Sequence, residues 1–399
     1  MKTGLVYRLN AKPRLALIIL ILTVFFTGGC WDRRELETLG IIAGFGLDWE
    51  EKDKQYLLTA QIIKPTQVRT PQGTSGGGGG GGGGEAVWVV KSKADTVFKG
   101  VRSFLFESSR RLYFPHNQIL IIGKKAAEEG VGPLLDLFLR DPEPRLSEWI
   151  VVAEEKAAEV LQAQAELEKI PGIALSRLLN NYADTSEIGR VDLMEFTTRL
   201  LSKTTAPYAP LIKVEGEGKE KKYRISGTAV FQKDKYVGEL NKRETRGLLW
   251  VLGEVQGGII SIDYGGKQVE VEIMQSNCGT TPEIKEGEIR IRVEIKAVAN
   301  LAANLTPVDF SATDRLRKLN TKLATAVKGE VEAALKRVQT LRVDPFAFGE
   351  AVHRKYPKEW RELEEKWTDV FPQIQVEVQV RTNLRLQGLI TRPVIMKED

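Results

Sequence analysis

The chain is poor in the side chains that hold metal ions and carry out acid–base catalysis. Its 399 residues include only two histidines, His116 and His353, and two cysteines, Cys30 and Cys278. No Cys-x-x-Cys or His-x-x-x-His spacing occurs, so a zinc site would have to recruit all four residues from remote places. We therefore expect neither a metal site nor a cofactor.

A charge excess of one sign is also missing once the first thirty residues are set aside. The formal net charge is +5, from 58 basic and 53 acidic residues. Residues 1–30 hold four of the basic residues and none of the acidic ones, which leaves 54 basic against 53 acidic residues. Domains that bind nucleic acid usually show a clear basic excess. We therefore expect no nucleic-acid partner.

A nucleophile placed beside a general base is not found either. His116 lies in the segment Tyr113-Phe-Pro-His-Asn-Gln, and the sequence contains no Gly-x-Ser-x-Gly or Ser-x-x-Lys motif to supply its partner. The paired acids Glu154–Glu155 and Glu364–Glu365 are adjacent on expected helices, where neighbouring side chains point apart. A structural histidine at a strand start is the preferred interpretation of His116, and we expect no enzymatic activity.

Long apolar runs are absent except near the amino terminus. Residues 15–26 are apolar apart from Thr23, follow four positive charges, and lead into Thr27-Gly-Gly-Cys30. This order of charged, apolar and small residues is typical of a secretory signal. The run is shorter than the about 20 residues that a membrane-spanning helix needs. The segment 1–29 resembles a bacterial lipoprotein signal, in which the cysteine thiol receives a diacylglycerol and becomes the first residue of the mature chain.

Two other interpretations of this segment stay open, a transmembrane anchor and a cleaved signal without lipid. The lipoprotein interpretation assigns Cys30 as the lipid anchor. It places the protein outside the cytoplasm, held at the membrane surface by acyl chains.

The first half of the mature chain mixes strand and helix patterns. Residues 39–49 alternate apolar side chains with small or polar ones, which indicates a half-buried strand. In residues 95–111, Val97, Val101, Phe104 and Leu105 share one face of an expected amphipathic helix. Further strands are expected at residues 56–63, 85–90, 117–122 and 147–153, and further helices at 124–139, 154–168, 173–182 and 191–201. We expect a mixed α/β-type domain over residues 30–203.

A glycine-rich stretch interrupts this domain at residues 73–84, with nine consecutive glycines from Gly76. A phosphate-binding loop needs Lys-Ser/Thr after its last glycine, but this run ends in Glu85 and Ala86. We therefore expect an expanded surface loop with no ligand.

Strand patterns dominate beyond residues 204–210, where two prolines indicate a boundary. Residues 289–297 alternate strictly between apolar and charged side chains, and apolar residues recur every three or four positions from Leu316 to Val338. Asn241 is the expected N-cap of a helix over residues 241–251. Other strands are expected at 212–215, 224–232, 236–240, 259–264, 268–274 and 374–380, and other helices at 345–356 and 357–370. The fold class is therefore expected to be α+β, with an antiparallel sheet packed on one long helix over residues 204–399.

Cys278 lies in the segment Ser276-Asn-Cys-Gly, where Asn277 and Gly279 suggest a turn or a bulge. A disulfide with Cys30 is conceivable, but Cys30 is better explained as the lipid anchor. We interpret Cys278 as a small buried hydrophobic residue.

Several segments resemble one family of bacterial proteins. The start, Cys30-Trp-Asp-Arg-Arg-Glu-Leu-Glu followed by residues 39–48, resembles the mature start of the Ger(x)C family. The segment His116-Asn-Gln-Ile-Leu-Ile-Ile-Gly-Lys-Lys-Ala with Arg140-Asp-Pro-Glu is similar to the family's N-terminal domain. The long helix, Asp344-Pro-Phe-Ala-Phe-Gly and the helix with Trp360 are similar to its C-terminal domain.

This resemblance implies a lipid-anchored C subunit of a spore nutrient germinant receptor, without enzymatic activity. It implies a location on the outer face of the spore's inner membrane or of the cell membrane, with a partly cytoplasmic A subunit and a transporter-like B subunit as partners. Trp31, Arg33 and Arg34 would lie close to the bilayer, so they are candidates for contact with the membrane subunits. A plain leash between lipid and domain is the alternative interpretation of these residues.

A different class of function also fits an anchored protein outside the cytoplasm. A lipid-anchored solute-binding protein would have two similar lobes of parallel α/β sheet around a cleft. The antiparallel pattern of the second half argues against that architecture.

Overall fold

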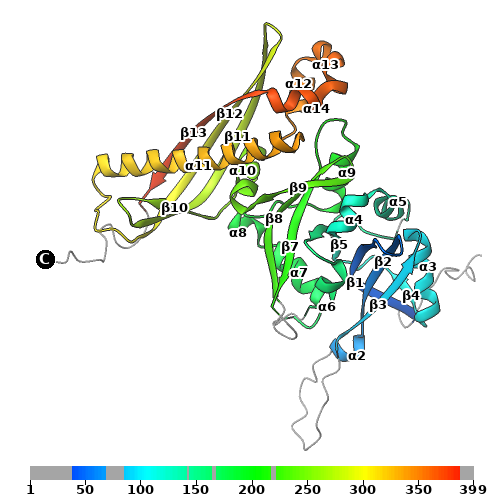
Figure 1. Ribbon diagram of the computed structural model, residues 1–399. Coiled ribbons are helices and arrows are strands. Elements are labelled where there is room, and N and C mark those ends of the chain that lie inside the picture. Colours follow the sequence, from blue (N-terminus) through cyan, green and yellow to red (C-terminus); the bar gives the residue numbers. More distant parts are fainter. Residues whose placement is uncertain (1–37, 69–84, 142, 164–167, 217–221, 387–399) are drawn as a thin grey trace, which may run out of the picture.

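The chain folds around two β-sheets in an α+β arrangement, as predicted. The computed structural model describes residues 38–68, 85–141, 143–163, 168–216 and 222–386. Figure 1 shows the first sheet with its helices on one side of the molecule, and the second sheet with the long helix α11 on the other. No helix within these residues is both long enough and apolar enough to cross a membrane.

The first sheet is mixed, with a parallel centre and antiparallel flanks. Its strand order is β3-β2-β1-β5-β6-β7-β8-β9, and β4 pairs with the beginning of β1. The four strands from β1 to β7 in this order are parallel, and the outer pairs are antiparallel. The strands are β1 (Leu39–Glu50), β2 (Gln55–Ile63), β3 (Val87–Ala94), β4 (Arg111–Tyr113), β5 (Ile119–Gly123), β6 (Trp149–Ala153), β7 (Tyr208–Glu215), β8 (Lys222–Gln232) and β9 (Lys235–Asn241).

The central strands are buried on both faces because helices cover the sheet from two sides. In β5, Leu120 and Ile122 face one apolar core, whereas Ile119 and Ile121 face another beneath α6 and α7. This explains why β5 is continuously apolar rather than alternating. The helices are α2 (Pro65–Val68), α3 (Val97–Glu107), α4 (Lys124–Glu129), α5 (Gly132–Arg140), α6 (Ala157–Gln162), α7 (Pro171–Leu179), α8 (Tyr182–Thr185) and α9 (Leu193–Leu201).

Strands on both sides of the expected boundary belong to one sheet. Residue 204 lies between α9 and β7, and β7, β8 and β9 continue the first sheet beyond it. The expected glycine-rich loop, residues 73–84, lies outside the described residues. Its flanks are held together, because the Lys64 amide donates to the Ala86 carbonyl at 2.8 Å.

The second sheet has the order β10-β11-β12-β13, with strands β10 (Ile259–Asp263), β11 (Gln268–Lys285), β12 (Glu288–Asn304) and β13 (Gln375–Arg385). The pairs β10–β11 and β11–β12 are antiparallel, whereas β13 runs parallel to β12 after the crossover through α11 (Thr313–Leu341). The interpretation of Ser276-Asn-Cys-Gly as a turn or bulge is wrong, because Ser276 to Gly279 pair in register with β12. The register shifts between Ile273 and Gln275 instead.

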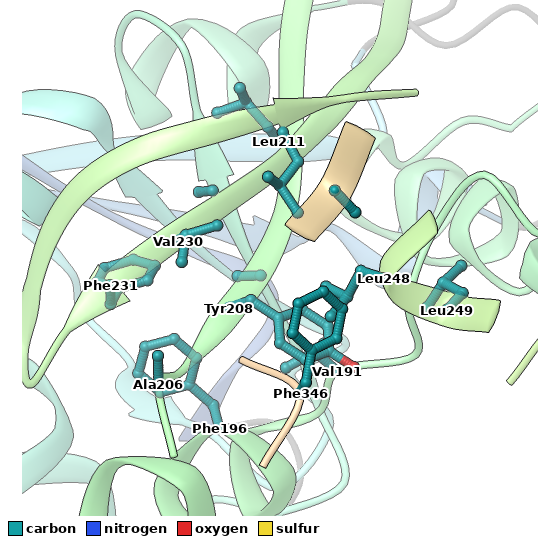
Figure 2. Close-up of a cluster of buried hydrophobic side chains, with 14 of the residues drawn as sticks. Val191, Phe196, Ala206, Tyr208, Leu211, Val230, Phe231, Leu248, Leu249 and Phe346 are labelled. Atoms are coloured by element: carbon teal, nitrogen blue, oxygen red, sulfur yellow. The ribbon is translucent and has the colours of Figure 1, made fainter. Parts of the chain in front are cut away.

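A continuous apolar core joins the two halves. Figure 2 shows Phe346, which follows α11, among side chains from the first sheet and from α10 (Lys242–Leu252), including Tyr208, Phe231 and Leu248. The Arg199 guanidinium also donates to the Pro345 carbonyl at 2.9 Å. The helices α12 (Phe348–Lys355), α13 (Pro357–Leu363) and α14 (Trp367–Val370) close this end of the molecule.

Candidate functional site

The two histidines do not form a catalytic arrangement. His116 is exposed and contacts Tyr113 with tilted rings, whose centroids lie 5.8 Å apart. His353 is exposed on α12 and stacks on Trp360 at 5.7 Å. Within the described part of the chain, no group of three or more His, Cys, Asp or Glu side chains is gathered to hold a metal ion.

Buried carboxyl groups stabilise the fold at helix starts. Asp48 accepts hydrogen bonds from the amides of Ala157 at 2.7 Å and Ala158 at 3.0 Å, so it caps α6 from a strand far away in sequence. Burial raises the pKa of Asp48 to about 6, and these two hydrogen bonds oppose the shift. Asp344 similarly accepts from the Gly349 amide at 2.8 Å and from the Trp367 indole at 3.1 Å. These hydrogen bonds give both carboxyl groups a structural role.

The buried charges between α10 and α11 are likewise paired inside the molecule. Glu330 receives a bidentate contact from Arg246 and a hydrogen bond from the Trp250 indole at 2.9 Å. Each oxygen of the Glu330 carboxylate is therefore engaged, and the group fixes the packing of the two helices.

One cleft has a volume of about 500 Å³ and lies beside α7, α8 and the ends of β7 and β8. Apolar residues Leu178 and Ile188 form part of its wall. The charged residues Glu215, Arg224 and Lys242 on its rim are engaged in ion pairs, Glu215 with Arg224 and Lys242 with Glu187. We find no converging set of uncommitted polar groups in this cleft that would bind a solute.

The predicted site residues Cys30, Trp31, Arg33 and Arg34 lie outside the described residues. The structure does show where the chain that follows them enters the domain. At Leu39 the chain joins the sheet, and Leu39 pairs in parallel with Arg111 at the start of β4. This end of the first sheet is therefore the attachment end of the domain.

The helix α3 runs back toward the attachment end, where its C-terminal turn lies, and it carries an exposed apolar surface. Thr96 caps it by accepting from the Lys99 amide at 3.3 Å, and Val97, Gly100 and Phe104 face the core. On the opposite side, Phe98 is 55% exposed, Leu105 48% and Phe106 92%. The Arg102 guanidinium lies 5.1 Å from the centroid of the Phe98 ring. We call Phe98, Arg102, Leu105 and Phe106 the outer face of α3.

Sequence reasoning missed this face, although a signal was present. The expectation that Leu105 faces the core is wrong, because the helix turns it toward solvent with Phe98, seven positions earlier. An apolar i, i+7 pair outside the core-facing stripe is the pattern that indicates a second apolar face on a helix. The helix also ends at Glu107, four residues before its expected end, because Arg111 begins β4.

Two family models match the chain in succession. The model described as the spore germination protein N-terminal domain matches residues 32–214. The model described as spore germination B3/GerAC like, C-terminal, matches residues 226–388. Together they span both halves of the fold.

Curated relatives match over nearly their whole length. The chain is similar to spore germination protein KC of Bacillus subtilis (strain 168), with 27% identity over 400 residues that cover 95% of this chain and 97% of the relative. It is also similar to spore germination protein B3 of the same organism, with 24% identity over 347 residues, 86% of this chain and 90% of the relative.

One solved structure has a similar fold. The crystal structure of the GerBC protein matches with a TM-score of 0.56 and 19% sequence identity, covering 85% of this chain and 97% of that one. At this identity the match supports the architecture, including the presence of both halves in one chain.

Proposed function

Because the chain belongs to the family of spore germination proteins that combine these two domains, we propose that it is the lipid-anchored C subunit of a nutrient germinant receptor. Family membership supports a role in spore germination. The observation that carries the proposal is the match of both family models, with relatives aligned over nearly their full length.

In this proposal, Cys30 carries a diacylglycerol that holds the protein at the outer face of the spore's inner membrane. In residues 1–30, positive charges are followed by an apolar run and then by small residues that lead to Cys30, and this order supports the anchor. Two acyl chains hold a protein stably at a bilayer, whereas one chain holds it only marginally.

The proposed partners are a membrane A subunit and a transporter-like B subunit, and the chain itself has no turnover. Trp31, Arg33 and Arg34 are the proposed contact residues, because the tether keeps them near any membrane subunit. The paired buried charges and the isolated histidines support a role in assembly rather than in catalysis. The solute-binding alternative lacks support from the architecture, because the second half is a sheet covered by α11 rather than a second α/β lobe.

The test uses a strain in which this protein belongs to the one functional germinant receptor. We expect Cys30→Ala to move the protein out of the membrane fraction and to reduce nutrient-triggered dipicolinate release at least tenfold. The control Cys278→Ala, at a half-buried thiol, should leave the membrane location and the dipicolinate release unchanged. The triple variant Trp31→Ala, Arg33→Ala, Arg34→Ala keeps the anchor and tests the contact residues through recovery of the A and B subunits.

Membrane retention of the Cys30→Ala protein would contradict the anchor. Normal germination together with normal recovery of both subunits in the triple variant would reduce the segment to a leash. An unchanged nutrient response after loss of the whole gene would falsify the receptor-subunit proposal.

A further inference from the structure

We propose that the outer face of α3 rests directly on the lipid bilayer, with Phe98, Leu105 and Phe106 in the membrane interface. This inference rests on the proposed anchor at Cys30. It adds a second membrane contact, made by the folded domain itself, and it sets the orientation of the domain on the membrane.

The first support is the degree of exposure. Phe106 is 92% exposed, more than any other large apolar side chain in the described part of the chain. Leu105 precedes it, and Phe98 lies about two turns earlier on the same helix. Large apolar side chains grouped in this way on the surface of a soluble domain mark an interaction site. The Arg102 guanidinium lies over the Phe98 ring, and a long basic side chain can keep its alkyl part in the interface while its charge reaches toward the headgroups.

The second support is position. Leu39 pairs with Arg111, which follows Phe106 by five residues, or at most about 17 Å of extended chain. Nine residues connect Cys30 to Leu39, so an anchored cysteine can lie at most about 30 Å from the sheet. The tether therefore keeps the attachment end of the domain within about 30 Å of the bilayer surface.

A further aromatic side chain lies toward the same end of the sheet. Trp88 in β3 is 38% exposed and pairs with Ile62, which in turn pairs with Ile42 near the start of β1. Trp88, Phe106 and the entry of the chain at Leu39 thus share one end of the sheet. Aromatic side chains are favoured at the boundary between lipid headgroups and acyl chains.

The size of the face favours a bilayer over a protein partner. Its three apolar side chains expose on the order of 400 Å², if each offers about 200 Å² when fully exposed. A stable protein complex buries about 800 Å² on each partner. A tethered domain needs less buried area for a stable contact, because the anchor keeps the face at a high effective concentration next to the bilayer.

Two basic side chains beside the face are held in ion pairs, which lowers their attraction to anionic lipid. Lys99 is paired with Asp95 at 2.7 Å, and Arg111 is paired with Glu143 at 3.0 Å. These basic side chains are therefore largely neutralised by their own neighbours. The contact should depend only weakly on salt.

The proposal places the second sheet away from the membrane. Figure 1 shows β10 and the far end of α11 on the opposite side of the molecule from α3 and β4. In this orientation, the second half of the chain reaches outward from the bilayer surface.

The test places a photoreactive benzoylphenylalanine at position 106 in the chain from Cys30 onward, in a Cys278→Ala background. The chain is coupled through the Cys30 thiol to maleimide-bearing vesicles of phosphatidylethanolamine and phosphatidylglycerol. This coupling supplies the anchor whether or not the cell lipidates Cys30, so failure of the proposed function does not affect the result. The matched control carries the same group at Met274, which is 49% exposed in the second sheet.

We expect illumination to give at least tenfold more lipid adduct from position 106 than from position 274. Raising the salt from 0.1 to 0.5 M should lower the yield at position 106 less than twofold. The further substitutions Phe98→Ser and Leu105→Ser should reduce it at least fivefold, with the circular dichroism spectrum unchanged. Equal adduct yields at 106 and 274 would overturn the proposal. Adducts predominantly to a protein, when the same chain is illuminated in spore membranes, would overturn it in favour of a partner subunit.

Discussion

At the scale of single residues, Glu148 is a buried carboxyl group whose pKa is raised well above its ordinary value. It is 2% exposed at the start of β6, where the Asn117 amide donates a hydrogen bond to one carboxylate oxygen. Burial raises the pKa of Glu148 to about 8, while the hydrogen bond from Asn117 opposes the shift. The carboxyl group is therefore protonated in the folded protein at neutral pH.

Because of this raised pKa, we predict that Glu148 lowers the free energy of unfolding as the pH rises. The unfolded chain releases the proton as the pH passes about 4.5, whereas the folded protein keeps it until about 8, so rising pH favours unfolding in this window. Glu148→Gln cannot ionise and still offers an oxygen to Asn117. We expect its free energy of unfolding, relative to wild type, to increase between pH 5 and pH 8, by at most about 4 kcal/mol at 1.4 kcal/mol per pH unit.

Urea unfolding of the chain from residue 31 onward, at both pH values, measures this difference. Because the other buried carboxyl groups are present in both proteins, their contributions cancel. The control is Glu128→Gln on the exposed side of α4, which should change little between the two pH values. A difference for Glu148→Gln that does not grow with pH would contradict the shift.

At the scale of elements, the packing of α10 on α11 depends on a glycine. A Cβ atom at Gly247 would lie 2.1 Å from the backbone oxygen of Glu330 and 2.8 Å from the Cβ of Ala334. Backbone atoms of a 29-residue helix cannot give way as a flexible side chain can. The close approach also brings Arg246 and Trp250 onto the Glu330 carboxylate.

We therefore expect Gly247→Ala to lower the free energy of unfolding by at least about 2 kcal/mol, because overpacking outweighs the gain in helix propensity. The matched control is Gly329→Ala on α11, where the added Cβ meets only the tip of Arg243 at 3.1 Å. That variant should keep or raise the stability by up to about 1 kcal/mol. Thermal unfolding of both variants measures these changes in stability. Equal changes for Gly247→Ala and Gly329→Ala would argue against the close approach of α10 to α11.

At the scale of the whole molecule, one apolar core runs through both halves. Val230 in the first sheet and Val293 in the second belong to the same buried cluster, which Figure 2 shows where α10 and Phe346 meet the first sheet. The Ala206 amide also donates to the Asp344 carbonyl at 2.9 Å across this junction. Apolar packing and these backbone and side-chain hydrogen bonds join the two halves, so neither is expected to unfold alone.

We therefore predict one cooperative unfolding transition for the chain from residue 31 onward. Hydrogen exchange followed by mass spectrometry in increasing urea should expose peptides from β6 and from β12 at the same midpoint. Two midpoints, separated by more than the error of the measurement, would show that the junction is weaker than its packing implies.

The sequence alone determined the features that depend on neighbouring residues. The alternation over residues 289–297 corresponds to β12, and the apolar recurrence from Leu316 to Val338 corresponds to α11. Asn241 caps α10 as expected, with the Glu244 side chain completing a capping box. These patterns are readable because the period of a helix or strand, and the hydrogen bonds of a cap, lie within a few residues. The assignment of Cys30, Trp31, Arg33 and Arg34 also comes from local order and remains a prediction.

Only the tertiary structure decided which elements meet. It joined β7, β8 and β9 to the first sheet, set β13 parallel to β12, and placed Asp48 at the start of α6. It also turned Phe98, Leu105 and Phe106 outward, the last two near the end where the chain enters the sheet. Local patterns do not specify these choices, because the free energy of pairing two distant segments depends on their register and on the other elements that cover them. An apolar residue is therefore recognisable in the sequence, but whether it faces the core or the surface is decided when the remote elements pack.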